Sequence, residues 1–176
     1  MKFALVSALP LLTVLAACQS VPDEQPSDRL AQATLRLANG QPAGAAQVLA
    51  SGSQVNVTVA LIGISPGVHG MHLHTTGSCD APEFTSAGGH LNPDHRQHGT
   101  ENPAGSHLGD LPNITIGSDG TGSASVTLNG TRDQVLAQLF DADGTAIVVH
   151  ASADDYKTDP SGNSGGRIAC GVLTRS

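Results

Sequence analysis

Short runs of alternating apolar and polar residues recur along the chain, and turn-forming residues separate them. In QVNVTVAL (54–61), Val55, Val57, Val59 and Leu61 share one face, because successive side chains of a β-strand point to opposite faces. Other segments have this alternation or are continuously apolar, as in well-buried strands. These further candidate strands cover 33–40, 45–50, 67–74, 113–128, 145–150 and 167–174.

These segments make about eight strands, because 113–128 contains an Asp-Gly pair and is expected to form a hairpin. Only 131–140 has the pattern of a helical turn. Many short strands separated by turns predict one all-β domain, an antiparallel sandwich or barrel. Residues 75–112 and 151–166 lack periodicity and are rich in Gly, Pro, Asp and His. Loops of that length in a compact domain are usually functional or disordered, so we expect them to carry the site.

The first residues indicate export. In MKFALVSALPLLTVLAAC one lysine precedes an apolar run that is shorter than the roughly 20 residues of a membrane span. We interpret residues 1–17 as a signal peptide, Cys18 as a lipid-modified N-terminus and the polar segment 18–30 as a tether to a domain of residues 31–176. The alternative is plain secretion, in which Cys18 is discarded.

Charge and cysteine content narrow the function classes. The chain carries 8 Lys and Arg against 15 Asp and Glu, a net charge of −7, so we expect no nucleic-acid partner. Cys79 and Cys170 remain after the signal, and an even count in an exported protein suggests a disulfide. Two unrelated thiols are the alternative.

All eight histidines lie between positions 69 and 150. His72 and His74 are two residues apart on a predicted strand, so both imidazoles leave the same face and can converge on one metal. His69 lies an odd number of residues from His72 and is expected on the other face, as a packed and hydrogen-bonded side chain. His150 ends the apolar run 145–150 and could supply a third imidazole from a rigid strand.

Two kinds of metal site suit these residues. Three strand imidazoles, those of His72, His74 and His150, suit copper, which favours nitrogen ligands. The long loop adds three more imidazoles and a carboxylate, a set suited to a structural tetrahedral zinc ion. These residues are His90, His98, His107 and Asp110. His90 could serve either cluster, or bridge the two if each ring nitrogen binds a different metal.

Five motifs now resemble one family. GVHGMHLH, GGHLNP, HGTENPAGSHLGDLPN, VVHASADD and GGRIACG match, in order, the motifs of the copper–zinc superoxide dismutases. The resemblance covers residues 31–175. It implies an eight-stranded antiparallel Greek-key barrel with two long functional loops, and an enzyme that converts superoxide to oxygen and hydrogen peroxide with one copper and one zinc per chain.

The resemblance also implies a role for each matching residue. The copper-only ligands would be His72, His74 and His150, the bridge His90, and the remaining zinc ligands His98, His107 and Asp110. Cys79 and Cys170 would form the intrachain disulfide, and Arg167 would guide the anion to copper. Asp154 would link His72 to His98, although the adjacent Asp155 could do so equally on residue type alone.

The second loop and His95 are among the departures from the family pattern. Lys157 is the single lysine of the second loop, among three aspartates, where many animal members carry several anion-attracting lysines. His95 matches no family role and is expected to be an exposed loop residue.

The sequence therefore predicts an exported, lipid-anchored dismutase of the periplasm or cell envelope, with superoxide as substrate and a possible homodimer. Its membrane contact would come only through a lipid on Cys18. An exported copper-binding or metal-buffering module on the same fold is the alternative. A copper-only dismutase is disfavoured, because the zinc ligands are all present.

Overall fold

The computed structural model describes residues 28–176. The expected signal peptide (1–17), the lipidation site Cys18 and most of the tether (18–30) lie outside these residues. The described elements, in chain order, are β1 (Asp28–Leu37), β2 (Pro42–Ser51), β3 (Gln54–Leu61), β4 (Gly67–His69), β5 (Met71–His74), the 3-10 turn η1 (Thr85–Ala87), β6 (Ile114–Ile116), β7 (Gly122–Thr127), α1 (Arg132–Leu139), β8 (Ala146–His150), β9 (Arg167–Val172) and β10 (Thr174–Arg175).

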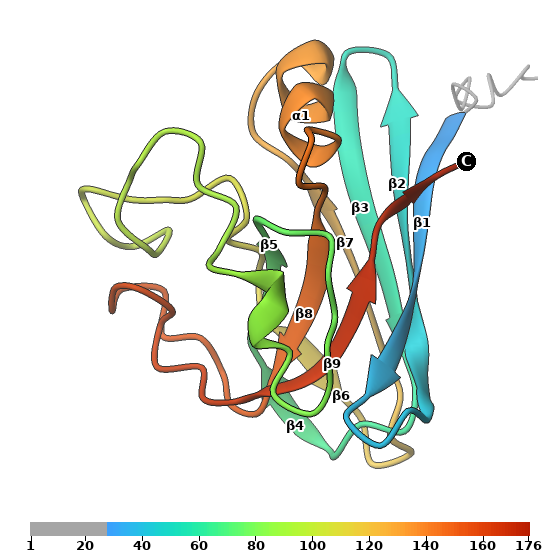
Figure 1. The fold of residues 1–176 in the computed structure, drawn as a ribbon. Helices are drawn as coiled ribbons and strands as arrows, with labels where there is room; N and C mark the ends of the chain where they lie inside the picture. The colour runs from blue at the N-terminus through green and yellow to red at the C-terminus, as the bar shows by residue number, and fades with distance from the viewer. Residues whose placement is uncertain (1–27) are drawn as a thin grey trace, which may run out of the picture.

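One curled antiparallel sheet contains most of the strands, in the order β5-β8-β9-β1-β2-β3-β7, with β10 beside β1. β9 pairs with β1, from the opposite end of the described chain, through Arg36 opposite Cys170. β4 and β6 form a small second sheet. Figure 1 shows the strands wrapping around a common interior. The predicted all-β antiparallel Greek-key barrel is confirmed.

The core follows from the alternation in the sequence. The valines of β3 and Leu61 are each at most 2% exposed, as predicted, while the intervening residues are more accessible. All residues of β5 and β8 are buried, although β5 is the end strand of the sheet. The helix also forms where expected: Thr131 caps α1 and exchanges hydrogen bonds with Gln134 in a capping box.

Two details differ from the prediction. The fourth candidate strand, 67–74, is split into β4 and β5 at Gly70. A Cβ at Gly70 would lie 2.9 Å from the Ser164 Cβ, so the second loop packs directly on the backbone at this break. The expected hairpin within 113–128 is wrong: a turn does connect β6 to β7, but β6 pairs with β4 and β7 with β3. The turn is encoded locally, whereas the strand partners are set by the rest of the barrel.

The two long segments, 75–112 and 151–166, extend from the same side of the barrel, at the left of Figure 1. The first passes beside β5 through the isolated bridges of His74 with His90 and of His72 with Asp110. The second follows β8 and returns into β9. Both predicted loops therefore meet at the edge of the sheet where the histidine strands lie.

Candidate metal centre

Four buried imidazoles come together where β5 and β8 meet the first loop. His72 and His74 lie on β5, His150 ends β8, and His90 lies in the loop. One ligand atom from each lies within 4.8 Å of the others. Among the buried polar atoms described, four ring nitrogens have no hydrogen-bond partner, and each belongs to one of these residues: His72 Nδ1, His74 Nε2, His90 Nε2 and His150 Nε2.

The other ring nitrogen of each strand histidine is fixed by the protein. His72 Nε2 lies 2.7 Å from Asp154 Oδ2, His74 Nδ1 lies 3.0 Å from the Gly88 carbonyl oxygen, and His150 Nδ1 lies 3.2 Å from that of Gly165. These oxygens accept hydrogen bonds, so each ring donates from that nitrogen and presents the orphaned one with its lone pair free. Burying unpaired polar atoms is costly. A metal ion that accepts the lone pairs of all four unpaired ring nitrogens would explain why these atoms converge.

A second cluster surrounds Asp110. Its Oδ1 lies 3.0 Å from the Nδ1 atoms of His90, His98 and His107, and the His90 and His107 Nδ1 atoms are 3.4 Å apart. A tetrahedral zinc ion with ligands at about 2.0–2.1 Å has ligand–ligand edges of about 3.3 Å. Three imidazoles and one carboxylate at this spacing fit zinc.

His72 also lies near this second cluster, because its ring stacks on that of His90 with centroids 3.9 Å apart. The His72 Nε2 atom is already bonded to Asp154, whereas His107 Nδ1 lies 3.0 Å from Asp110 Oδ1. His107 is therefore the better fourth member of the set. His90 belongs to both clusters: its Nδ1 faces Asp110 and its Nε2 faces the strand histidines.

Asp154 links the two clusters by contacting one histidine of each. Its Oδ2 contacts His72 Nε2 at 2.7 Å and its Oδ1 contacts His98 Nε2 at 3.0 Å. The neighbouring Asp155 is exposed and binds only residues of its own loop, such as Thr158. A Cβ at Gly162 would overlap the Asp154 carboxylate and lie 2.8 Å from His98 Nε2, so only glycine fits behind this link.

Burial and hydrogen bonding set the charges of the two clusters differently. Burial lowers the pKa of His74 to about 2, that of His150 to about 3 and that of His90 to about 4, so these rings are neutral at neutral pH. Burial also acts to lower the pKa of His98, but its hydrogen bonds to Asp110 and Asp154 outweigh burial and raise that pKa to about 9. The same hydrogen bonds hold the pKa values of both carboxyl groups below their usual range, against burial.

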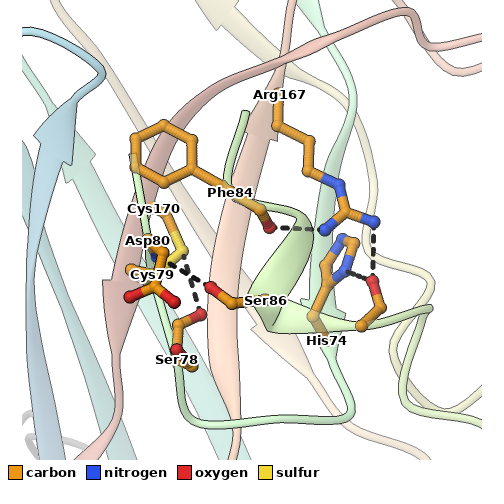
Figure 2. Close-up of a disulfide and its surroundings, with 9 residues drawn as sticks. His74, Ser78, Cys79, Asp80, Phe84, Ser86, Arg167 and Cys170 are labelled. Carbon is orange, nitrogen blue, oxygen red and sulfur yellow. Dashed lines mark hydrogen bonds between the residues drawn. A yellow bond between two sulfur atoms is a disulfide. The ribbon is translucent and has the colours of Figure 1, made fainter. Parts of the chain in front are cut away.

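A cleft of about 510 Å³ opens beside the four converging imidazoles, and its lining includes His74, His90, His150 and Arg167. Arg167 is half-buried and donates from Nη1 to the Phe84 carbonyl and from Nη2 to the Gly88 carbonyl, each at 2.6 Å. Figure 2 shows its guanidinium beside His74. The cleft therefore offers a fixed positive charge to an anion that approaches the four imidazoles.

The disulfide forms as expected between Cys79 in the first loop and Cys170 in β9, with their Cα atoms 5.7 Å apart. It lies next to the Arg167 segment in Figure 2. The two cysteines are 91 residues apart in sequence, so the bond ties the first loop to the barrel.

The chain matches the family model described as copper/zinc superoxide dismutase over residues 43–173. The chain belongs to this family. The superoxide dismutase-like protein YojM of Bacillus subtilis is 42% identical over 124 residues, which are 68% of this chain and 62% of YojM. A superoxide dismutase [Cu-Zn] of Caulobacter vibrioides is 41% identical over 149 residues, 81% of this chain and 84% of the relative.

Solved structures show the same similarity. The crystal structure of a SOD-like protein from Bacillus subtilis superposes with a TM-score of 0.77 at 35% identity, covering 84% of this chain and all of that one. Copper and zinc are the metals of the copper/zinc superoxide dismutase family, and the two clusters fit them. Among the described residues, no helix is long and apolar enough to cross a membrane.

Residues outside the clusters also lie as expected. The buried His69 ring has its nitrogens 2.8 and 2.9 Å from the carbonyl oxygens of His150 and Ser65, so it is packed and hydrogen-bonded. His95 is exposed in the first loop. Lys157 forms an ion pair with Glu101 at 2.8 Å on the surface, so its charge is partly neutralised.

The sequence did not reveal the backbone groups that hold the histidines and Arg167 in place. The carbonyls of Phe84, Gly88 and Gly165 carry no side-chain signal that a pattern search could find. Arg96 also acts through its backbone, because its carbonyl lies 3.1 Å from His107 Nε2. Phe84 left one signal, as an isolated aromatic residue within a long polar loop of a chain with only three phenylalanines.

Proposed function

We propose that the chain dismutates superoxide: two superoxide ions and two protons give one dioxygen and one hydrogen peroxide. The observation that carries this proposal is the convergence of four unpaired ring nitrogens beside a cleft that is lined by three of their rings, those of His74, His90 and His150, and by Arg167. A site for a redox metal, open to solvent and paired with a fixed cation, suits one-electron chemistry on a small anion.

The metal ligands follow from the ring nitrogens. Copper would be held by the orphaned nitrogens of His72, His74, His90 and His150. Zinc would be held by the Nδ1 atoms of His90, His98 and His107 with Asp110 Oδ1. His90 would then bridge the metals through its two nitrogens, because its Nε2 is free on one side while its Nδ1 lies 3.0 Å from Asp110 Oδ1 on the other.

Copper supplies the reversible one-electron step when it is bound, and the chain's own residues would do the rest. Arg167 would bind the anion with the N–H groups that its carbonyl partners leave free. The His90 residue lines the same cleft, and we assign to its unpaired Nε2 atom the proton that is delivered to the reduced substrate. Asp154 would keep His72 and His98 in fixed tautomers while that proton moves.

The cellular setting is a further part of the proposal. The Cys79–Cys170 disulfide and the bacterial relatives support an exported protein, since such bonds persist in oxidising compartments. We place the enzyme in the periplasm or cell envelope, with residues 1–17 as signal peptide and a lipid on Cys18. Assembly as a homodimer is compatible with this arrangement.

The competing function is a metal-carrying module on the same fold, since a fold does not determine an activity. YojM, named only dismutase-like, is about as similar to this chain as the Caulobacter vibrioides dismutase, so sequence identity does not separate the two functions. The complete nitrogen set and the Arg167 contacts favour the enzyme, because a metal carrier needs no anion-binding group beside its copper.

The test compares the metal-loaded protein with a His150→Ala variant and a His95→Ala control. The wild-type protein should bind one copper and one zinc and dismutate superoxide rapidly. His150→Ala should lose copper and activity while retaining zinc, and His95→Ala should match the wild type, because His95 is exposed and outside both clusters. Full loading of both metals without dismutation would support the metal-carrying module instead.

A further inference from the structure

The orientation of Arg167 depends on five residues of the first loop. Both of its carbonyl partners lie in residues 84–88, at the two ends of η1. A guanidinium has five N–H donors in a rigid plane, and these two hydrogen bonds fix the direction of the remaining three. Whatever holds this segment in place therefore determines where Arg167 presents its free donors.

Phe84 is the buried side chain that anchors the segment. It is 2% exposed and belongs to a small apolar cluster, separate from the main core, beneath the first loop. The cluster contains Phe84, Ala87, Ala146, Val148 and Cys170, with Cys79 packed against it. Phe84 is the only large residue of this set, so most of the apolar surface that seats the segment on β8 and β9 is its ring.

The Phe84 backbone is also unusual. Its φ of 54° and ψ of 28° are left-handed, a conformation that residues other than glycine, asparagine and aspartate rarely adopt. Such a conformation persists only where the surroundings impose it, and burial of the ring is the evident source here. The left-handed turn places the Phe84 carbonyl within 2.6 Å of Arg167 Nη1.

The segment also touches the metal centre. The Gly88 carbonyl accepts hydrogen bonds from both Arg167 Nη2 and His74 Nδ1, at 2.6 and 3.0 Å. The disulfide restrains the chain at Cys79, five residues before Phe84, so the carbonyls that bind Arg167 lie outside the residue that it ties down. Figure 2 shows Phe84 between the disulfide and the guanidinium.

We propose that Phe84 is a positioning residue for Arg167: burial of its ring holds the carbonyl that orients the guanidinium toward the cleft. This proposal rests on the anion-guiding role assigned to Arg167 above. Phe84 itself touches neither substrate nor metal.

The test is a double-mutant cycle on the metal-loaded full-length protein. Phe84→Ala should lower kcat/KM for superoxide about tenfold, within the range by which local charge changes association rates. Phe84→Leu, which keeps a large apolar side chain, should restore most of the rate. In an Arg167→Gln background Phe84→Ala should have no further effect on kcat/KM, because both changes act through the same guanidinium. Phe140→Ala, which truncates the other described phenylalanine at the end of α1, is the control for lost apolar burial.

Each outcome is informative. Equal rate losses from Phe84→Ala with and without Arg167 would overturn the proposal, as would a full rate in Phe84→Ala. Metal content and thermal unfolding are measured for every variant. A loss of rate that tracks lost copper or unfolding, as strongly in Phe140→Ala as in Phe84→Ala, would also overturn it. If Arg167→Gln alone leaves the rate unchanged, the role of Arg167 in the proposed function fails first.

Discussion

The two halves of the metal centre are built in different ways. On the side that we propose for copper, His72, His74 and His150 project from the fully buried strands β5 and β8, and each has one ring nitrogen fixed by an acceptor. On the side that we propose for zinc, His98 and His107 lie in a loop without a strand, and their Nδ1 atoms meet at Asp110. The barrel thus preforms one half, while the other half is held by its own polar contacts.

This difference assigns a separate task to each metal. A site on rigid strands keeps its geometry while the metal changes charge, which suits a redox centre. A ligand cluster that is held by polar contacts of a loop gains its order from the ion that it binds, as structural zinc sites do. His90 and Asp154 connect the halves, so the loop metal can fix the side chains that serve the strand metal.

The largest effect should come from breaking the zinc half. Asp110→Ala removes the one atom that all three Nδ1 groups share, so zinc should be lost and the first loop should open. Loss of a bound ion whose free concentration is about 1,000 times its Kd lowers the free energy of unfolding by about 4 kcal/mol. For a chain of this size, that corresponds to a fall in Tm on the order of 10 °C.

In the Asp110→Ala variant, hydrogen exchange followed by mass spectrometry measures the protection of the two halves separately. Amides of 90–112 should exchange much faster, while those of β5 and β8 stay protected. His150→Ala should lose copper and leave the loop protected. Equal loss of protection in the loop and in β5 would contradict a preformed copper half.

The connection between the halves should give an intermediate effect. Asp154→Asn cannot accept hydrogen bonds from both His72 and His98, because one carboxylate oxygen becomes an amide donor. Removing such a partner typically costs 10–100-fold in metal affinity, and we expect this for zinc and copper together. Competition with a chelator measures both affinities. Asp155→Asn is the matched control, and an equal loss in that variant would mean that the loop fold, not the link, matters.

In the metal-free protein, the histidines of the two halves should contribute to stability with opposite pH dependence. The pKa values of His74 and His150 are lowered by burial from about 6.5 to about 2 and about 3, so their contribution to stability is complete above pH 6.5 and is lost as the pH falls toward 3. The pKa of His98 is raised to about 9, so its contribution is complete below pH 6.5 and is lost as the pH rises through 9. Imidazole NMR should find His98 charged and His74 neutral at pH 7.5. Identical titration of both rings would remove the electrostatic difference.

The smallest effect should come from the second-loop lysine. Lys157 and Glu101 are 65% and 55% exposed, and such surface pairs contribute little to stability. Because its charge is already paired, Lys157→Gln should change kcat/KM for superoxide less than about twofold at low ionic strength. A tenfold loss, measured by pulse radiolysis, would show that this lysine attracts the anion despite its partner.

Much of the fold could be predicted because it is encoded by local alternation. The buried face of β3, the apolar run of β8 before His150 and the helix start at Thr131 all follow from short-range patterns. The break at Gly70 depends on Ser164 in a distant loop, and the partners of β6 and β7 depend on the whole barrel. No window of sequence contains that information.

The candidate site likewise combines features that local sequence predicts with features that depend on distant residues. The common face of His72 and His74 follows from strand parity, and the structure brings these rings together with His150 and His90. Which nitrogen each ring presents depends on carbonyls such as that of Gly88, which the sequence does not reveal. Residue type alone does not choose between the adjacent Asp154 and Asp155; the family resemblance favours Asp154, and the structure places that carboxylate between His72 and His98.

The central claim is that two different metals share one imidazole, and anomalous diffraction at the copper and zinc absorption edges tests it most directly. Crystals of the protein loaded with both metals should show one copper peak at the nitrogens of His72, His74 and His150. One zinc peak should lie at His98, His107 and Asp110, with the His90 ring between the two. A single occupied site, or a His90 ring that contacts only one metal in both oxidation states, would contradict the account.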